Sequence, residues 1–220
     1  MVDNYKKGDT SGFESDLQNN FEPQRHKLEK KGKKLGVSSG HLYFAIPRLW
    51  EFYGPKSRFI LLVRKPEEFV RSAMARGFFD TEHPNYCNQL SPAFSEPISS
   101  SWKTISVLER NLWYWVLVNK FVLKEFEKIP QQYWRIVKIE ELSLDLVLDI
   151  RKFIGSDEVD QDEIIKLLNT RINSSPEQPG NIEPNPLSRP VTMPALSEWD
   201  EHQKKLLTEY TSDLVNNLYG

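Results

Sequence analysis

Apolar and polar positions along the chain follow patterns that predict strands separated by helices. A continuous apolar run at 59–63 is typical of a parallel strand that is covered on both faces. The run from Trp134 to Ile139 alternates polar and apolar side chains and predicts a further strand, and a short strand is expected at 34–38. Helical spacing of apolar residues, together with start and stop signals, predicts helices at 23–34, 42–53, 66–76, 105–129, 142–155, 161–169 and 197–219.

The order of these elements predicts the fold class. Strands that alternate with helices build an α/β fold, in which helices cover a parallel sheet in three layers. At 220 residues the chain is expected to form a single domain, with a polar and helical segment at 1–33 and a proline-rich loop at 171–196. Three strands are few for this length, so we expect the sheet to be incomplete on its N-terminal side.

The end of the apolar run carries the most informative chemistry. Arg64 follows the strand directly, and Pro66 suits the first position of a helix because the N–H that proline lacks would have no partner there. Ligands of open α/β sheets bind beyond the carboxyl ends of the strands, and a guanidinium can donate to two phosphate oxygens at once. The segment therefore predicts a phosphate site at Arg64 and Ser72. The alternative is an ion pair between Arg64 and a surface carboxylate, with Ser72 facing water.

Composition and charge limit the partners. The 29 basic and 31 acidic residues give a net charge of −2, so there is no global basic field for nucleic acid or for an anionic membrane surface. The single cysteine, Cys87, excludes an internal disulfide bond and a metal site built from cysteines. No apolar run is long enough to span a membrane, and the residues after Met1 do not resemble a signal peptide, so a soluble, cytoplasmic protein is expected.

Three segments resemble motifs of the sulfotransferase family, whose members transfer a sulfonate group from 3′-phosphoadenosine 5′-phosphosulfate (PAPS). In chain order they are Arg64-x-Pro66-x5-Ser72, the run 136–142 followed by 152–155, and Trp199 with the closing Leu-Tyr-Gly. The first resembles the family's binding motif for the 3′-phosphate of the nucleotide. The resemblance covers residues 34–220 and implies a parallel sheet of the P-loop/sulfotransferase type. It also implies a nucleotide site at Arg64 and Ser72, and PAPS as co-substrate with no metal.

The resemblance also accounts for the short sheet. Members of the family begin with a strand that leads into a glycine- and hydroxyl-rich loop around the 5′-phosphosulfate. The only candidate for that loop is 5–12, which only four residues precede, and we interpret it as a polar N-terminal segment. We therefore expect either an N-terminally truncated sulfotransferase or a relative that has lost the donor loop.

The resemblance implies roles for two further residues. Some members carry their catalytic histidine at a position similar to His41, where an imidazole can take the proton of the acceptor hydroxyl. The alternative is that His41 caps a helix. In the family the stretch that corresponds to the proline-rich loop folds over the nucleotide, so Arg189 is expected near the phosphates. The alternative is a loose tether with Arg189 in water.

These observations together predict an enzyme that transfers sulfonate to a hydroxyl or amine of a small-molecule or glycan acceptor. The alternative is a catalytically inactive, truncated sulfotransferase-fold protein that binds the nucleotide or serves as a scaffold. A small-molecule kinase of the P-loop class shares the strand–helix plan, but the chain has no Gly-x4-Gly-Lys-Ser/Thr loop. We expect the variable loop 77–100 to contact the acceptor. Four of its aromatic side chains either line an apolar pocket or cover the core: Phe78, Phe79, Tyr86 and Phe94.

Overall fold

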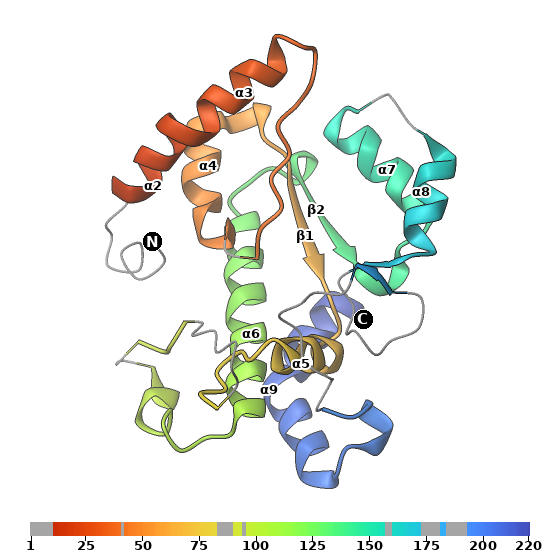
Figure 1. Cartoon of the computed structure of the whole chain (residues 1–220). Coiled ribbons are helices and arrows are strands. Elements are labelled where there is room, and N and C mark those ends of the chain that lie inside the picture. The colour runs from red at the N-terminus through yellow and green to blue at the C-terminus, as the bar shows by residue number, and fades with distance from the viewer. Residues whose placement is uncertain are drawn as a thin grey trace.

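The computed structural model describes residues 11–40, 42–82, 90–93, 96–156, 160–172, 181–183 and 193–220. These residues form a mostly helical arrangement around a small parallel sheet, in keeping with an α/β fold (Figure 1). The helices are α2 (Ser11–Asp16), α3 (Glu22–Glu29), α4 (Ile46–Tyr53), α5 (Pro66–Ala75), α6 (Val107–Phe126), α7 (Leu144–Ile154), α8 (Gln161–Leu168) and α9 (Glu201–Tyr219). The strands are β1 (Phe59–Val63), β2 (Trp134–Lys138), β3 (Arg171–Ile172) and β4 (Asn181–Glu183).

Strands β1 and β2 form the sheet that was expected at the centre of the fold. They pair in parallel, in a register that runs from Phe59 opposite Trp134 to Val63 opposite Lys138. This confirms the predicted parallel pairing, and a connection that contains α5 and α6 joins the two strands. Because the strands are parallel, their carboxyl ends lie at the same edge of the sheet, next to the start of α5 (Figure 1).

The two faces of β1 are covered unequally. Leu61 and Val63 pack toward α6, where Val63 is only 1% exposed. On the opposite face Ile60 and Leu62 are 37% and 52% exposed. The prediction that this strand is covered on both faces is therefore wrong for the described residues, although Val137 of β2 is buried. A continuous apolar run cannot distinguish a strand that is covered twice from one that leaves part of a face open.

Helix α6 is the central packing element. A capping box begins it: the Ser106 hydroxyl accepts the N–H of Glu109, and the Glu109 carboxylate accepts the N–H of Ser106. Its buried side chains include Leu112, Trp115 and Phe126, which the helical periodicity of the sequence anticipated.

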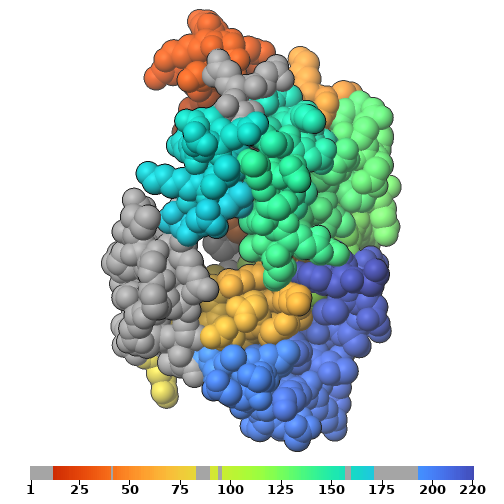
Figure 2. Space-filling view, turned by 90° about the vertical axis from the view of Figure 1, so that its right-hand side faces the viewer, coloured from red at the N-terminus to blue at the C-terminus, as the bar shows by residue number. Residues whose placement is uncertain are grey.

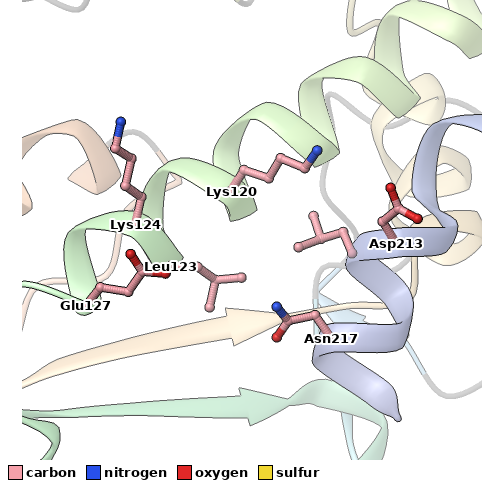
Figure 3. Close-up of a pocket in the computed structure, with 7 residues that line it drawn as sticks. Lys120, Leu123, Lys124, Glu127, Asp213 and Asn217 are labelled. Atoms are coloured by element: carbon pink, nitrogen blue, oxygen red, sulfur yellow. The ribbon is translucent and has the colours of Figure 1, made fainter.

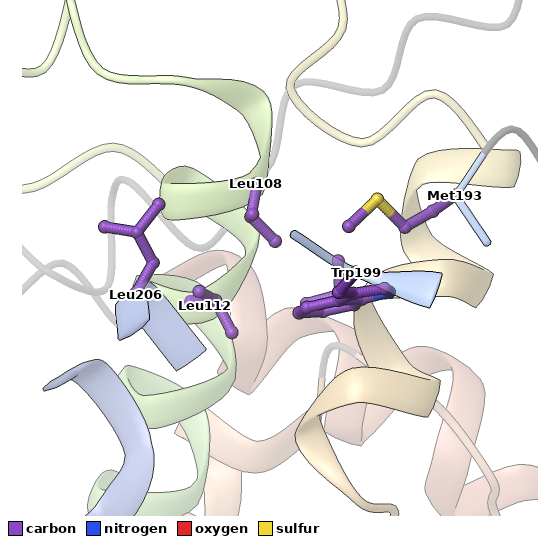
Figure 4. Packing of buried hydrophobic residues seen from close by; sticks show 6 residues of the cluster. Leu108, Leu112, Met193, Trp199 and Leu206 are labelled. Atoms are coloured by element: carbon purple, nitrogen blue, oxygen red, sulfur yellow. The ribbon is translucent and has the colours of Figure 1, made fainter. Parts of the chain in front are cut away.

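A second packing layer joins α5 and α6 to the C-terminal part of the chain. The buried cluster consists of Val70, Leu108, Leu112, Met193, Trp199 and Leu206. Figure 4 shows the Trp199 ring below Met193 and beside the leucines of α6. The residues that precede α9 are thus part of the core and fix where this helix starts.

Helix α7 ends at the predicted position, but the segment 34–38, which contacts this end, does not form the predicted strand. Gly155 adopts the left-handed conformation with φ of 65°, and its N–H donates to carbonyl oxygens of the last turn of α7. Lys34 Nζ donates to the carbonyl oxygens of Ile154 at 2.8 Å and Gly155 at 2.6 Å. The strand predicted at 34–38 is absent: this segment is mostly exposed and pairs with neither β1 nor β2.

Replacing Gly155 by alanine is expected to lower the free energy of unfolding by about 1–2 kcal/mol. A side chain is unfavourable at this positive φ, and the added Cβ would collide with Lys34 Nζ. Urea denaturation measures the change. Gly36→Ala is the matched control, because Gly36 has no positive φ and open space around it. It should change stability by less than about 0.5 kcal/mol, and equal losses in the two variants would contradict the role of Gly155.

Two further expectations need correction. The closing helix was predicted to start at Ser197, but Ser197 lies in a 3₁₀ turn, and α9 is capped by Asp200 in a capping box with Gln203. Asp200 follows Trp199, whose burial sets the start of the helix. The short parallel pair of β3 and β4, at the beginning of the proline-rich loop, was not predicted. Among the described residues, no helix combines the length and the apolar character needed to cross a membrane.

Candidate functional site

The backbone between β1 and α5 is held by two other elements. The indole N–H of Trp115, on α6, donates to the carbonyl oxygen of Arg64 at 2.9 Å. The N–H of Lys65 donates to the carboxylate of Glu140, directly after β2, at 2.7 Å. Pro66 is buried at the start of α5. The residue that carries the predicted anion-binding guanidinium is therefore fixed by α6 on one side and by the neighbouring strand end on the other.

A row of four residues at steps of four runs from the end of β1, along one face of α5, to the C-cap of this helix. The row consists of Arg64, Glu68, Ser72 and Arg76. Arg64 Nη2 lies 3.3 Å from Glu68 Oε2. Arg76 Nη1 donates to the carbonyl oxygen of Ser72 at 3.0 Å and also to the Ser72 hydroxyl. This row, called the Arg64 row below, has an arginine at each end and contains two contacting pairs, Arg64 with Glu68 and Arg76 with Ser72.

The two ends of the Arg64 row influence each other electrostatically. Burial, and after it the charge of Arg64, lowers the pKa of Arg76 from its ordinary value. Arginine nevertheless stays charged at physiological pH, so the row contains two cations that repel each other. The Arg64 side chain is 39% exposed and can be reached from solvent. An anion that contacts this end of the row would reduce the repulsion.

The sequence left open that Arg64 forms an ion pair with a surface carboxylate. The structure contains such a pair, between Arg64 and Glu68. The alternative for Ser72 does not hold. Its side chain is half-buried and receives a hydrogen bond from Arg76 instead of facing water. Arg64 and Ser72 thus each have a protein partner, Glu68 for Arg64 and Arg76 for Ser72.

Glu68 has a second partner. Its Oε1 accepts a hydrogen bond from Arg71 Nη1 at 2.9 Å. Arg71 Nε also donates to the carbonyl oxygen of Met193 at 3.3 Å, which links α5 to the last part of the proline-rich loop. The sequence analysis missed Glu68, Arg71 and Arg76. Their spacing from Arg64 and Ser72 was visible in the sequence as steps of three and four residues.

Glu140 connects the backbone between β1 and α5 to Tyr219 at the end of α9. The Tyr219 hydroxyl donates to Glu140 Oε2 at 3.3 Å, and Lys138 Nζ lies 5.3 Å from the centre of the Tyr219 ring. Burial first and the Glu140 carboxylate second raise the pKa of Tyr219 above its ordinary value, so its hydroxyl stays protonated as a donor. In the sequence Glu140 was only part of a motif, and its contacts depend on elements far apart in the chain.

The described aromatic residues of the 77–100 loop cover the core. Phe79 is 4% exposed, and its ring lies edge-on to the rings of Trp102 and Tyr114. Phe78 likewise lies edge-on to Tyr114. The second interpretation given for these side chains therefore holds for Phe78 and Phe79. Four other residues singled out from the sequence lie outside the described residues: His41, Tyr86, Phe94 and Arg189.

Two hollows are visible on the molecule. Figure 2 shows one between α7 and α8 on one side and α5 on the other. The second is a groove of about 380 Å³ between α6 and α9, where Figure 3 shows Lys120 and Lys124 on α6 across from Asp213 on α9. Neither Arg64 nor Ser72 lines this groove, so it is not the predicted nucleotide site.

Comparison with known proteins gives no relative from which a role could be transferred. No family model, no curated protein and no solved structure matches the chain.

Proposed function

We propose that the Arg64 row binds the 3′-phosphate of PAPS and that the protein is sulfotransferase-like, transferring sulfonate to a hydroxyl or amine of a small-molecule or glycan acceptor. One observation carries the proposal: Arg64 directly follows the carboxyl end of a parallel strand, and its side chain is 39% exposed there. Phosphate ligands of parallel sheets bind at this edge, and arginine matches the geometry of phosphate oxygens. The proposal includes the larger sulfotransferase-type sheet, of which β1 and β2 would be two strands.

The proposed reaction is an in-line displacement at sulfur. The acceptor oxygen or nitrogen forms a bond to sulfur while the bond from sulfur to the bridging phosphate oxygen breaks, and adenosine 3′,5′-bisphosphate leaves. The proton of the acceptor goes to a base, for which His41 is the candidate that the sequence offers. Arg64 and Ser72 would position the nucleotide by its 3′-phosphate, and such positioning is a large part of catalysis in group transfer.

A second candidate function is nucleotide binding without transfer, and the position of α2 favours it. Ser11 and Gly12, the end of the only candidate donor loop, belong to α2. Figure 1 shows this helix well apart from α5, and Phe13 of α2 packs against Phe44 instead of near Arg64. Assays with PAPS and a panel of phenols, sugars and amines separate the candidates. Turnover supports transfer, whereas nucleotide binding without turnover supports the second candidate.

Arg64→Ala tests the phosphate site. The wild-type chain is expected to bind adenosine 3′,5′-bisphosphate more tightly than 5′-AMP, because only the bisphosphate has a 3′-phosphate for Arg64. The variant should lose about 1.5–3 kcal/mol for the bisphosphate, the usual value of a hydrogen bond to a charged group. That loss corresponds to about one to two decades in Kd. Isothermal titration calorimetry with both nucleotides measures the preference.

Lys65→Ala is the matched control for this experiment. It removes one positive charge from the neighbouring exposed residue, and no contact places its ammonium group in the Arg64 row. It should therefore retain the preference for the bisphosphate, with a change in Kd of at most about threefold. Equal affinity of the wild-type chain for the two nucleotides would refute the assignment of the 3′-phosphate site.

A further inference from the structure

Glu68 divides its carboxylate between two arginines in an unequal way. Oε1 accepts from Arg71 Nη1 at 2.9 Å, and Oε2 lies 3.3 Å from Arg64 Nη2. The two contacts use different oxygens, so one can be given up while the other stays. The Arg71 contact is shorter, and the Arg71 side chain is the less exposed of the two, at 24% against 39%. Arg71 is therefore the stronger partner of Glu68, and Arg64 is the weaker one.

This division determines what an incoming anion has to displace. A phosphate oxygen that approaches Arg64 Nη2 on the side of Glu68 competes with Oε2 for the same N–H. Glu68 does not lose its charge partner in the exchange, since Arg71 remains within hydrogen-bond distance. The anion therefore competes only with the longer and more exposed contact, and exposed ion pairs are weak.

We propose that Glu68 is an affinity-determining residue of the anion site, and that its carboxylate competes with phosphate for the guanidinium of Arg64. The inference rests on the proposed phosphate site at Arg64. Glu68 acts on the ligand through Arg64 and is a positioning residue.

The competing carboxylate also makes the site selective for charge. A ligand carboxylate that replaces Glu68 at Arg64 exchanges one singly charged group for another and gains little. A phosphate monoester carries close to two negative charges above its second pKa of about 6, so it gains more from the same guanidinium. The site is thereby expected to favour doubly charged phosphate monoesters over carboxylates and phosphodiesters.

Glu68→Gln tests the competition, because glutamine keeps the shape of the side chain and removes its charge. The probe is inorganic phosphate at a pH of about 8, where it is a dianion. Binding is followed by the shift of backbone amide resonances near Arg64. We expect phosphate to bind about two- to fivefold more tightly to E68Q than to the wild-type chain. This gain corresponds to about 0.4–1 kcal/mol, the range measured for exposed ion pairs.

Two further variants make the test specific. Glu67→Gln removes the same charge from the neighbouring position of the same helical turn, and no ion pair joins Glu67 to Arg64 among the described residues. It should therefore leave the phosphate Kd within about 1.5-fold of the wild type, well inside the value of an exposed pair. In the background of Arg64→Ala, E68Q should produce no gain, because Glu68 acts through Arg64.

The outcomes separate this inference from the proposed function. A gain in E68Q that is absent from E67Q and from the R64A background supports competition by Glu68. An unchanged or weaker affinity in E68Q, a gain that persists without Arg64, or a wild-type chain that binds no phosphate overturns it. The probe contains no nucleoside. A chain that shows the E68Q gain but binds the bisphosphate and 5′-AMP equally well would refute the nucleotide site and leave the role of Glu68 standing.

Discussion

Trp115→Ala is expected to lower the free energy of unfolding by about 3–5 kcal/mol, the usual cost of truncating a large buried aromatic side chain. Trp115 is 2% exposed and belongs to the cluster in which α6, β1 and α9 meet. Its neighbours in this cluster include Val63 and Leu214. Alanine would leave a cavity between three elements that cannot all close around it. Urea denaturation followed by circular dichroism gives the loss, provided that the slope m is unchanged.

Trp115→Phe separates the packing of this residue from its hydrogen bond. Phenylalanine retains most of the apolar volume but cannot donate to the carbonyl oxygen of Arg64. The expected loss is about 1–2 kcal/mol, the cost of leaving a largely buried acceptor without its partner. If the alanine and phenylalanine variants lose the same amount, the indole N–H and not the packing dominates. A loss below about 1.5 kcal/mol in W115A would contradict a core role for this side chain.

Trp199→Ala is the second substitution with a large expected effect, again about 3–5 kcal/mol. Trp199 is 2% exposed beside Leu112 and Met193 (Figure 4), and its indole N–H donates to the carbonyl oxygen of Pro194 at 3.0 Å. The substitution removes the ring and this bond together. For a chain of this length the midpoint of thermal unfolding should fall by about 6–20 °C, at about 2–4 °C for each kcal/mol. Differential scanning calorimetry measures the shift.

Trp50→Ala is the control for Trp199. The ring of Trp50 packs against Tyr133, at 5.1 Å between ring centroids, but the Trp50 side chain is only partly buried. Truncating Trp50 removes less buried apolar area than truncating Trp199 does. The midpoint of thermal unfolding of W50A should therefore fall by about half as much as that of W199A, or less. A larger fall in W50A than in W199A would mean that the packing before α9 contributes less than its burial indicates.

The sequence predicted those elements whose signals are local. The apolar run at 59–63 and the following Pro66 gave β1 and the start of α5 within one residue. The glycine at 155 gave the end of α7. In each case the residues that determine the element lie within it or next to it, so no knowledge of the tertiary structure was needed.

Elements that depend on distant contacts were predicted less well. The segment 34–38 has strand-like alternation, but Lys34 is held by the carbonyl end of α7, some 120 residues away, and the segment pairs with neither strand. The closing helix was predicted to start at Ser197, but its N-cap is Asp200, which follows the buried Trp199. Propensity alone ranks the two caps almost equally.

For the candidate site, the sequence located Arg64 and Ser72 but not their partners. Arg76 follows Ser72 at a step of four residues within the predicted helix, so helical spacing indicated their contact. Arg64 precedes the helix, so its contact with Glu68 had a weaker signal in the sequence. The contact of Glu140 with the N–H of Lys65 has no such local signal, because it spans 75 positions of the chain. It depends on the parallel pairing of β1 and β2, which brings the two strand ends together.

The hydrogen bond between Tyr219 and Glu140 has a practical consequence for the production of the protein. Because Tyr219 contacts the carboxylate that holds the Lys65 N–H, an affinity tag fused after Gly220 would emerge beside the candidate anion site. A polyhistidine tag at that end would place imidazoles next to the Arg64 row and disturb ligand titrations. Figure 1 shows α2, the first helix of the described residues, away from this junction. A tag on the N-terminal side of the chain is therefore the better choice for the binding experiments.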